Sequence, residues 1–304
     1  MTEKTEAKGH SEEYFGTNRD YWYNFDFLEL MAKRWNLSSR TSLLDVGCGQ
    51  CHWSGLLSDF LPRGASVVAV DNDKKWSKGH SQLTQRFREK SLNFSIQYAD
   101  AYSLPFDDNS FDVVTGQTVL IHLKSPEKAL LEMKRVLKPG GILISAEPNN
   151  ISQRIFKDAI SNTYSIEERI EMIKYGMVEE EGKIKAGNGD NSLGDMVPGL
   201  FNAVGLKTIQ AYLSDKCSTL IPPYASDEMK ATTHWITDES DFKSDMDTEI
   251  KEYFGLHKGK YDDLFDKLLE REQFDKEELR RAIENESYHC AGAVVMYLVS
   301  GIKE

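Results

Sequence analysis

The chain has 304 residues, a formal net charge of −12 and a hydrophobic fraction of 40%. That length suffices for one α/β domain of roughly 200 residues together with a smaller additional part. Because an acidic surface repels phosphate backbones, the composition disfavours nucleic acid as a partner and favours a small molecule.

The N-terminal residues and the number of cysteines indicate the cellular compartment that we expect for the protein. Residues 2–6 are polar or charged, so the N-terminus lacks the apolar run of a signal peptide, and no stretch of the chain is long and apolar enough to span a membrane. Four scattered cysteines are too few for a disulfide framework in a chain of this size. We expect a cytoplasmic protein without membrane association, and both a monomer and a homodimer stay open.

The first predicted element is an amphipathic helix over residues 20–35. Its apolar positions recur at helical spacing: Tyr23, Phe27, Leu30 or Met31, and Trp35. Further aromatic residues lie before this stripe or off it: Tyr14, Phe15, Tyr21, Trp22 and Phe25. Tyr14, Phe15, Tyr21, Trp22 and Tyr23 form an aromatic cluster that could close over a ligand, and we expect one of its tyrosines to line the site, although aromatic side chains at helical spacing are more often core than binding site.

Five apolar segments separated by helical stretches then predict strands over residues 42–46, 66–70, 94–98, 111–115 and 142–146. The helix between the last two spans residues 126–137, with Ser125 as its cap and Pro126 at its first position. This alternation predicts an α/β fold with a doubly wound parallel sheet, whose ligand lies at the carboxyl ends of the strands.

The regular alternation ends after residue 148. Residues 149–190 are polar and partly helical, with a capping box beginning at Ser165. A helix over 195–204 and a strand over 207–213 follow, and 222–287 is a charged segment with two or three helices. A buried final strand is predicted over 289–299.

A glycine loop follows the first strand. Asp45 closes that strand, and Gly47 and Gly49 allow the backbone to approach a ligand that any Cβ would exclude. The second strand ends in Asp71, an acid suited to accept both hydrogen bonds of a ribose diol. The third glycine of a dinucleotide fingerprint is replaced by His52, which argues against a pyrophosphate and for a smaller cofactor.

The glycine loop, Asp71 and the segments 98–101, 111–114 and 135–141 together resemble the class I S-adenosylmethionine-dependent methyltransferases of the small-molecule type. The resemblance spans residues 41–150. It implies a Rossmann-like, seven-stranded sheet whose last strand is antiparallel and pairs with the sixth. The core would comprise residues 41–150, 191–221 and 288–304, and a helical cap would comprise residues 1–40, 151–190 and 222–287.

The same resemblance implies the cofactor site. Asp45, Gly47 and Gly49 match the loop around the methionine and ribose, with Asp45 reaching toward the ammonium group. Asp71, followed by Asn72, matches the ribose-binding acid. The adenine would be read by Asp100 and Ala101, and the backbone of Gln117 would face the methionine ammonium.

For catalysis, His122 is the candidate base, since imidazole accepts a proton near neutral pH. A structural histidine bonded to the backbone is the equal alternative. Tyr14 and Tyr21 are candidates to line the site from the N-terminal helix, and Glu147 and Asn149 are secondary candidates for orienting substrate. No metal-ligand spacing is present.

The expected reaction is in-line transfer of the methyl group of S-adenosyl-L-methionine to oxygen, nitrogen or carbon of a small molecule, leaving S-adenosyl-L-homocysteine. A methyltransferase acting on protein or tRNA is the second hypothesis, and a non-catalytic cofactor-binding module is the third. Cys48 and Cys51 form a C-x-x-C pair, which could indicate redox or zinc chemistry. Two small residues in a tight turn are the simpler interpretation.

Overall fold

The computed structural model describes residue 19 and residues 21–76, 81–237, 242–292 and 294–304. Tyr14 and Phe15 lie outside this part of the chain. Within the described ranges, no helix combines the length and the apolar character that crossing a membrane requires.

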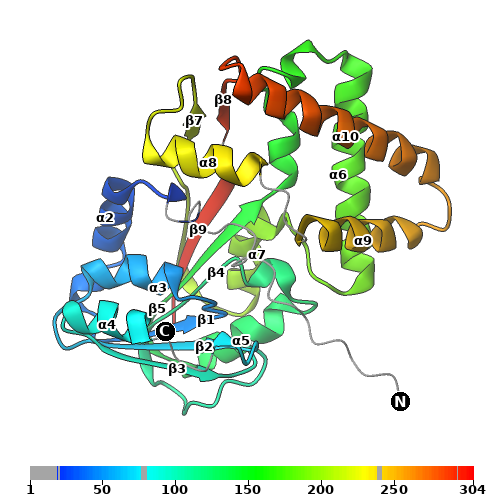
Figure 1. Ribbon diagram of the computed structural model, residues 1–304. Coiled ribbons are helices and arrows are strands. Elements are labelled where there is room, and N and C mark those ends of the chain that lie inside the picture. Colours follow the sequence, from blue (N-terminus) through cyan, green and yellow to red (C-terminus); the bar gives the residue numbers. More distant parts are fainter. Residues whose placement is uncertain (1–18, 20, 77–80, 238–241, 293) are drawn as a thin grey trace.

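A seven-stranded sheet in the order β3-β2-β1-β4-β5-β9-β6 forms the centre of the molecule (Figure 1). Its strands are β1 (Ser42–Val46), β2 (Ser66–Asp71), β3 (Asn93–Tyr98), β4 (Phe111–Gln117), β5 (Leu137–Asn149), β6 (Lys207–Leu213) and β9 (Val295–Ile302). β9 runs antiparallel to both of its neighbours, β5 and β6, and the pairs from β3 to β5 are parallel. The predicted doubly wound sheet with an antiparallel last strand is confirmed.

Helices cover both faces of this sheet because successive strand residues point to opposite sides. Leu43 packs with one set of helices, α2 (Phe25–Arg34), α3 (His52–Leu57) and α4 (Ser81–Glu89). Leu44, the next residue, packs with α5 (Pro126–Val136) and α7 (Val197–Ala203). Both leucines are fully buried, so the apolar strands form two cores separated by the sheet.

Further helices lie outside these layers. α6 (Ile166–Ala186), α9 (Phe242–Gly255) and α10 (Asp262–Glu284) share a small core of their own, in which the rings of Tyr175 and Phe254 stack at 4.9 Å. Figure 1 shows these three helices together, apart from the sheet. Beside them, α8 (Asp227–Thr237) adjoins a separate two-stranded sheet of β7 (Ser218–Leu220) and β8 (Cys290–Gly292).

Local signals were mostly right about where helices begin. The Ser165 hydroxyl accepts from the backbone N–H of Glu168, whose carboxylate accepts from the Ser165 N–H, so the capping box is confirmed. Ser125 stands at the N-cap of α5, but its side chain makes no capping hydrogen bond. In α2 Met31 is buried and Leu30 is 44% exposed, which decides between the two alternatives.

The predicted final strand over 289–299 was wrong in its extent. Residues 290–292 form β8 and pair with β7, outside the main sheet. β9 begins only at Val295 and continues to Ile302. The apolar run from Cys290 to Val299 hid this division, because periodicity does not report which partner a strand takes.

Candidate active site

The glycine loop after β1 is fixed from two sides. The backbone N–H groups of Gly47 and Cys48 donate to the carbonyl of Val70 at 2.8 and 3.0 Å. Gly47 and Gly49 have φ of +69° and +48°, a region that favours glycine. A Cβ added to Gly47 would lie 2.6 Å from Cγ2 of Val119, so this position also requires glycine for space.

Asp71 holds the same loop from the end of β2. Its Oδ2 accepts from the N–H of Gly49 at 2.9 Å, and its Oδ1 accepts from the N–H of Asp73 at 2.8 Å. Burial raises the pKa of this carboxyl, while the amide hydrogen bonds oppose the rise. Because each carboxylate oxygen can accept two hydrogen bonds, both oxygens keep acceptor capacity for a diol.

The neighbouring strand ends carry the other predicted cofactor residues. The N–H of Ala99 donates to the Asp71 carbonyl at 2.9 Å, which joins the ends of β2 and β3. Asp100 follows at once, exposed, with Oδ1 accepting from the Tyr102 N–H at 2.9 Å, and Ala101 is half-buried. Asp71 and Asp100 therefore lie at adjacent strand ends, and Asn72 is exposed beside them.

Asp45 lies deeper than the rest of the set. Its side chain is 1% exposed, and Oδ2 accepts from the backbone N–H of Ser54 in α3 at 3.3 Å. The contact joins the end of β1 to the helix that follows the glycine loop. Asp45 therefore stabilises the glycine loop by connecting the strand before it to the helix after it.

The residues before α2 reach the end of β4. Gln117 is 5% exposed, and its Nε2 donates to the hydroxyl of Tyr23 at 3.0 Å. The Tyr23 ring lies 5.3 Å from that of Trp53, whose Nε1 donates to the Thr115 hydroxyl at 2.7 Å. Burial raises the pKa of Tyr23 above its ordinary value, so this hydroxyl stays protonated.

Tyr23 belongs to the N-terminal aromatic cluster from which the sequence predicted that one tyrosine lines the site, and it is the tyrosine that contacts Gln117. Its helical spacing had assigned it to the buried stripe, and nothing in the sequence marks its hydroxyl as the partner of Gln117. Tyr21, the candidate from the same segment, is half-buried. Tyr14 lies outside the described residues.

Glu147 at the end of β5 is fully buried, and the structure gives it a different role from the predicted one. Its carboxylate accepts from the backbone N–H groups of Val119 and Leu120 at 3.0 and 2.9 Å, and from that of Ile121 at 3.4 Å. Burial raises its pKa to about 7. The side chain thus holds the loop after β4, and it does not face outward to orient a substrate.

Asn149 likewise makes contacts within the protein. Its Nδ2 donates to the Asp195 carboxylate at 3.1 Å, and its Oδ1 accepts from the Ser152 N–H at the same distance. The predicted role in orienting substrate stays a prediction for this residue.

His122 ends the loop that Glu147 holds. Its side chain is exposed, and its Nδ1 lies 3.5 Å from Nζ of Lys183, a residue of α6. Lys183 is 6% exposed and also donates to the carbonyl of Ile121 at 3.3 Å. A histidine of the core and a lysine of the predicted cap thus meet at the end of β4.

The C-x-x-C pair lies inside the glycine loop, with Cys48 5% exposed, Cys51 fully buried and both thiols free. The contact with Cys51 and burial raise the pKa of the Cys48 thiol, which disfavours a reactive thiolate. Within the described residues, no group of three histidine, cysteine or acidic side chains is arranged to hold a metal ion. The simpler interpretation of the pair fits the structure.

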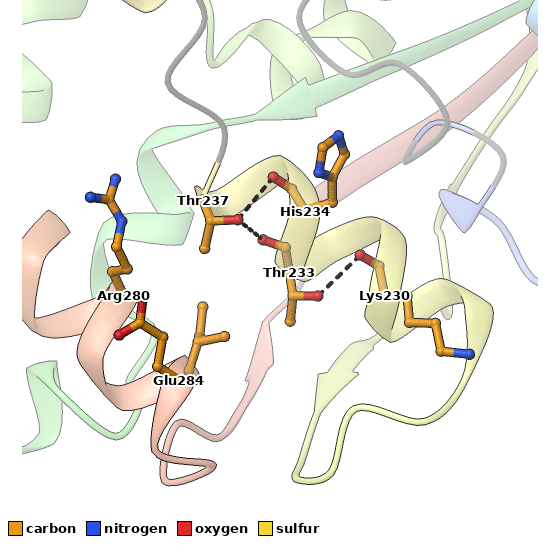
Figure 2. A pocket seen from close by; sticks show the side chains of 7 residues that line it. Lys230, Thr233, His234, Thr237, Arg280 and Glu284 are labelled. Carbon is orange, nitrogen blue, oxygen red and sulfur yellow. Dashed lines mark hydrogen bonds between the residues drawn. The ribbon is translucent and has the colours of Figure 1, made fainter.

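The described part of the surface has two recesses to compare with the predicted site. One of about 570 Å³ opens between α8 and α10 (Figure 2), and none of its lining residues belongs to the predicted site. In it the hydroxyls of Thr233 and Thr237 donate to carbonyls of their own helix. The other, of about 140 Å³, lies beside the loop after β4 and is bounded by Leu120, Leu123 and Ile184. The larger recess contains none of the predicted cofactor residues, which lie together at the strand ends, so the strand ends are the better candidate site.

Comparison with known proteins agrees with this geometry. Residues 44–145 match the family described as a methyltransferase domain. An uncharacterized methyltransferase of Schizosaccharomyces pombe is 34% identical over 117 residues, covering 38% of this chain and 42% of that protein. The demethylmenaquinone methyltransferase of Staphylococcus saprophyticus is 32% identical over 127 residues, covering 42% of this chain and 53% of the enzyme.

These matches cover about half the length of the curated relatives. Among solved structures, the YcgJ protein from Bacillus subtilis is similar with a TM-score of 0.49 and 17% identity, covering 92% of this chain and 99% of that one.

Proposed function

We propose that residues 44–145, which match a methyltransferase domain, belong to a class I methyltransferase, and that the protein transfers a methyl group from S-adenosyl-L-methionine to a small-molecule acceptor. The observation that carries the proposal is the meeting of the glycine loop, Asp71, Asp100 and Gln117 at the carboxyl ends of adjacent parallel strands. In open α/β sheets this edge is where ligands bind.

The residues at this edge fit the cofactor. Gly47 and Gly49 carry no side chain, so a nucleoside can approach the backbone of this loop closely. In our proposal Asp71 accepts the hydroxyls of the ribose, and Asp100 with Ala101 binds the adenine. Gln117 and the loop of Asp45, Gly47 and Gly49 hold the methionine part, and Asn72 lies beside the ribose.

The bound cofactor supplies an electrophilic methyl group on a sulfonium. In the transfer, the acceptor atom bonds to the methyl carbon while the sulfur keeps the electrons of the broken bond, and S-adenosyl-L-homocysteine leaves. The protein's task is to align the acceptor and exclude water, and such alignment can supply roughly 7–11 kcal/mol. We assign alignment to His122, Tyr21 and Tyr14, and enclosure to the cap of residues 1–40, 151–190 and 222–287.

A small molecule is favoured over a macromolecule as acceptor. The net charge of −12 opposes binding to RNA, and one relative methylates demethylmenaquinone according to its name. Protein or tRNA as acceptor, and a module that binds the cofactor without catalysis, remain the other hypotheses. A cytoplasmic location and a monomeric or homodimeric state belong to the same proposal.

The test is transfer of label from methyl-labelled S-adenosylmethionine into a fractionated cell extract, with Asp71→Ala as the control. Label in a compound of low mass that depends on Asp71 supports the proposal and isolates the acceptor. Label only in protein or RNA favours the second hypothesis. Tight cofactor binding without transfer in any fraction favours the non-catalytic module.

A further inference from the structure

One buried lysine bonds α6 to the loop after β4. Nζ of Lys183 donates to the carbonyl of Ile121 at 3.3 Å and to Oδ1 of Asn191, and the lysine is 6% exposed. An ammonium group with so little access to water needs acceptors of this kind. Lys183 therefore joins three segments, which are its own helix, the loop that follows this helix and the loop after β4.

The loop after α6 also holds the segment that follows β5. The backbone N–H of Ile151 donates to the hydroxyl of Ser192 at 2.8 Å, and that hydroxyl donates to the carboxylate of Glu180 in α6. In the same loop Gly189 has a φ of +91°, and an added Cβ would lie 2.2 Å from the carbonyl oxygen of Ile121. The ends of β4 and β5 thus share one support, the last part of α6 with the loop after it.

This support belongs to a unit that has a core of its own. α6 packs with α9 and α10 through buried apolar residues such as Tyr175 and Phe254, and the three helices lie together, apart from the sheet (Figure 1). The sheet holds the loop after β4 separately, because Glu147 of β5 accepts hydrogen bonds from three of its backbone amides. The loop that carries His122 is therefore fixed by the sheet through Glu147 and by the three helices through Lys183.

The charges around Lys183 favour its ammonium form near neutral pH. Burial lowers its pKa to about 8, and four carboxylates oppose that effect. At pH 7 the group is therefore mostly protonated, and it loses its proton as the pH rises through about 8. The titratable groups around it are Glu179 and Glu180 of α6, Asp190 of the following loop, Glu249 of α9 and His122 of the loop after β4.

We propose that Lys183 is a positioning residue for the methyl transfer, which sets the loop after β4 in place for the acceptor only while the unit of α6, α9 and α10 is docked on the core. This inference rests on the proposed function and concerns the same site. Asp71 and the glycine loop are held by different contacts, those with each other and with the carbonyl of Val70. We therefore expect Lys183 to control the transfer and not the affinity for the cofactor.

The linkage can be observed at a single peptide bond. Ile121 and His122 form the only isoleucine–histidine pair in the sequence, so ¹³C-carbonyl isoleucine combined with ¹⁵N-histidine gives one NMR signal for the Ile121 carbonyl in the full-length protein. In the wild type this signal should shift as the pH rises through about 8. Lys183→Gln should abolish the shift. A shift caused by titration of His122 would persist in this variant, because the histidine is still present.

Two further variants complete the test. Lys185→Gln is the matched control, since Lys185 lies on the same helix and its Nζ is 3.2 Å from Nδ1 of a different histidine, His257; it should leave the Ile121 signal unchanged. Asn191→Leu keeps Lys183 and tests the linkage even if Lys183→Gln does not fold. Because the ammonium group then loses an acceptor, the midpoint of the shift should move to lower pH.

The reaction gives a second readout. Lys183→Gln should lower the turnover number by about 10- to 100-fold, because misplacement by about 1 Å can cost about 100-fold, and it should leave the dissociation constant of S-adenosylmethionine unchanged. The wild-type turnover number should also fall as the pH rises through about 8, and the variant should lack this fall.

Two results would overturn the inference: an Ile121 signal with the same pH dependence in wild type and Lys183→Gln, or an unchanged turnover number in the folded variant. The signal is measured without any methyl transfer. A wild type that shows the expected shift and methylates nothing would therefore refute the proposed function and leave the linkage between Lys183 and the loop intact.

Discussion

Replacing Glu147 by glutamine tests which of two opposing effects controls its ionisation. Burial disfavours the carboxylate, whereas three backbone N–H groups favour it by donating to it. If burial prevails, the folded protein binds a proton at Glu147 up to a pH of about 7. The unfolded chain releases that proton near the ordinary pKa of 4.5.

The sign and size of the effect follow from this difference. A carboxyl whose pKa is raised in the folded state stabilises the fold less as the pH increases from the unfolded to the folded value. The rise from 4.5 to about 7 corresponds to about 3 kcal/mol. Glutamine resembles the protonated acid in shape and does not titrate. The stability of Glu147→Gln relative to wild type should therefore increase by about 3 kcal/mol between about pH 4 and pH 8.

Urea denaturation followed by tryptophan fluorescence, repeated across this pH range, measures both proteins. Glu127→Gln, at an exposed position of α5, controls for the loss of a negative charge. A constant difference between wild type and Glu147→Gln would refute the reasoning. A difference that moves the other way would show that the three amides outweigh burial and that the group is ionised throughout.

Three further substitutions probe the site and its support. Asp71→Ala should weaken binding of S-adenosylmethionine by roughly 100-fold or more in calorimetry, because charged hydrogen bonds contribute about 1.5–3 kcal/mol each; unchanged affinity would remove Asp71 from the ribose. Gly47→Ala should cost about 1–3 kcal/mol of stability and most cofactor binding, since its φ is +69° and Val119 fills the space; normal binding would contradict a tight loop. Asp112→Asn should cost about 1–2 kcal/mol and leave cofactor affinity unchanged, because its carboxylate meets Lys138 at 2.9 Å at the amino end of the sheet. Burial raises the pKa of Asp112, but hydrogen bonds from Lys138, Thr41 and Ser42 outweigh this effect and hold the pKa well below its usual range. The contribution of Asp112 to the free energy of unfolding should therefore disappear when denaturation is repeated at pH values falling below about 4.

The central sheet was predictable because its strands are short apolar runs bounded by turn residues. The limits of β1 and β6 agree with the sequence to the residue, and Gly205 follows the end of α7 with a positive φ, whereas Gly140 and Gly141 lie inside β5, which begins at Leu137 and not at the predicted residue 142. Strand pairing was predictable only through the family resemblance. The diversion of residues 290–292 into a separate sheet depends on β7, a segment of three residues that leaves little sequence signal.

The site residues also fall into those that local sequence predicts and those that depend on distant partners. Local patterns identified Gly47, Gly49 and Asp71, whose roles depend on residues near them in sequence. Glu147 was misjudged because its partners lie about 26 to 28 residues away in another loop. Lys183 went unnoticed, since on a charged helix nothing in sequence distinguishes the one lysine that is turned inward over His122.

The placement of β9 has a consequence for how the chain assembles. β9 is the last of the seven strands in chain order, yet it lies between β5 and β6 and is the strand through which β6 joins the sheet. During synthesis, residues 207–213 must wait for about 80 residues, some 4 to 16 seconds of elongation, before their partner exists. In that interval the edge of β5 is open to pairing with other chains. Three helices emerge meanwhile, two of them with a core shared with α6, so this part of the fold can form before β9 closes the sheet between β5 and β6.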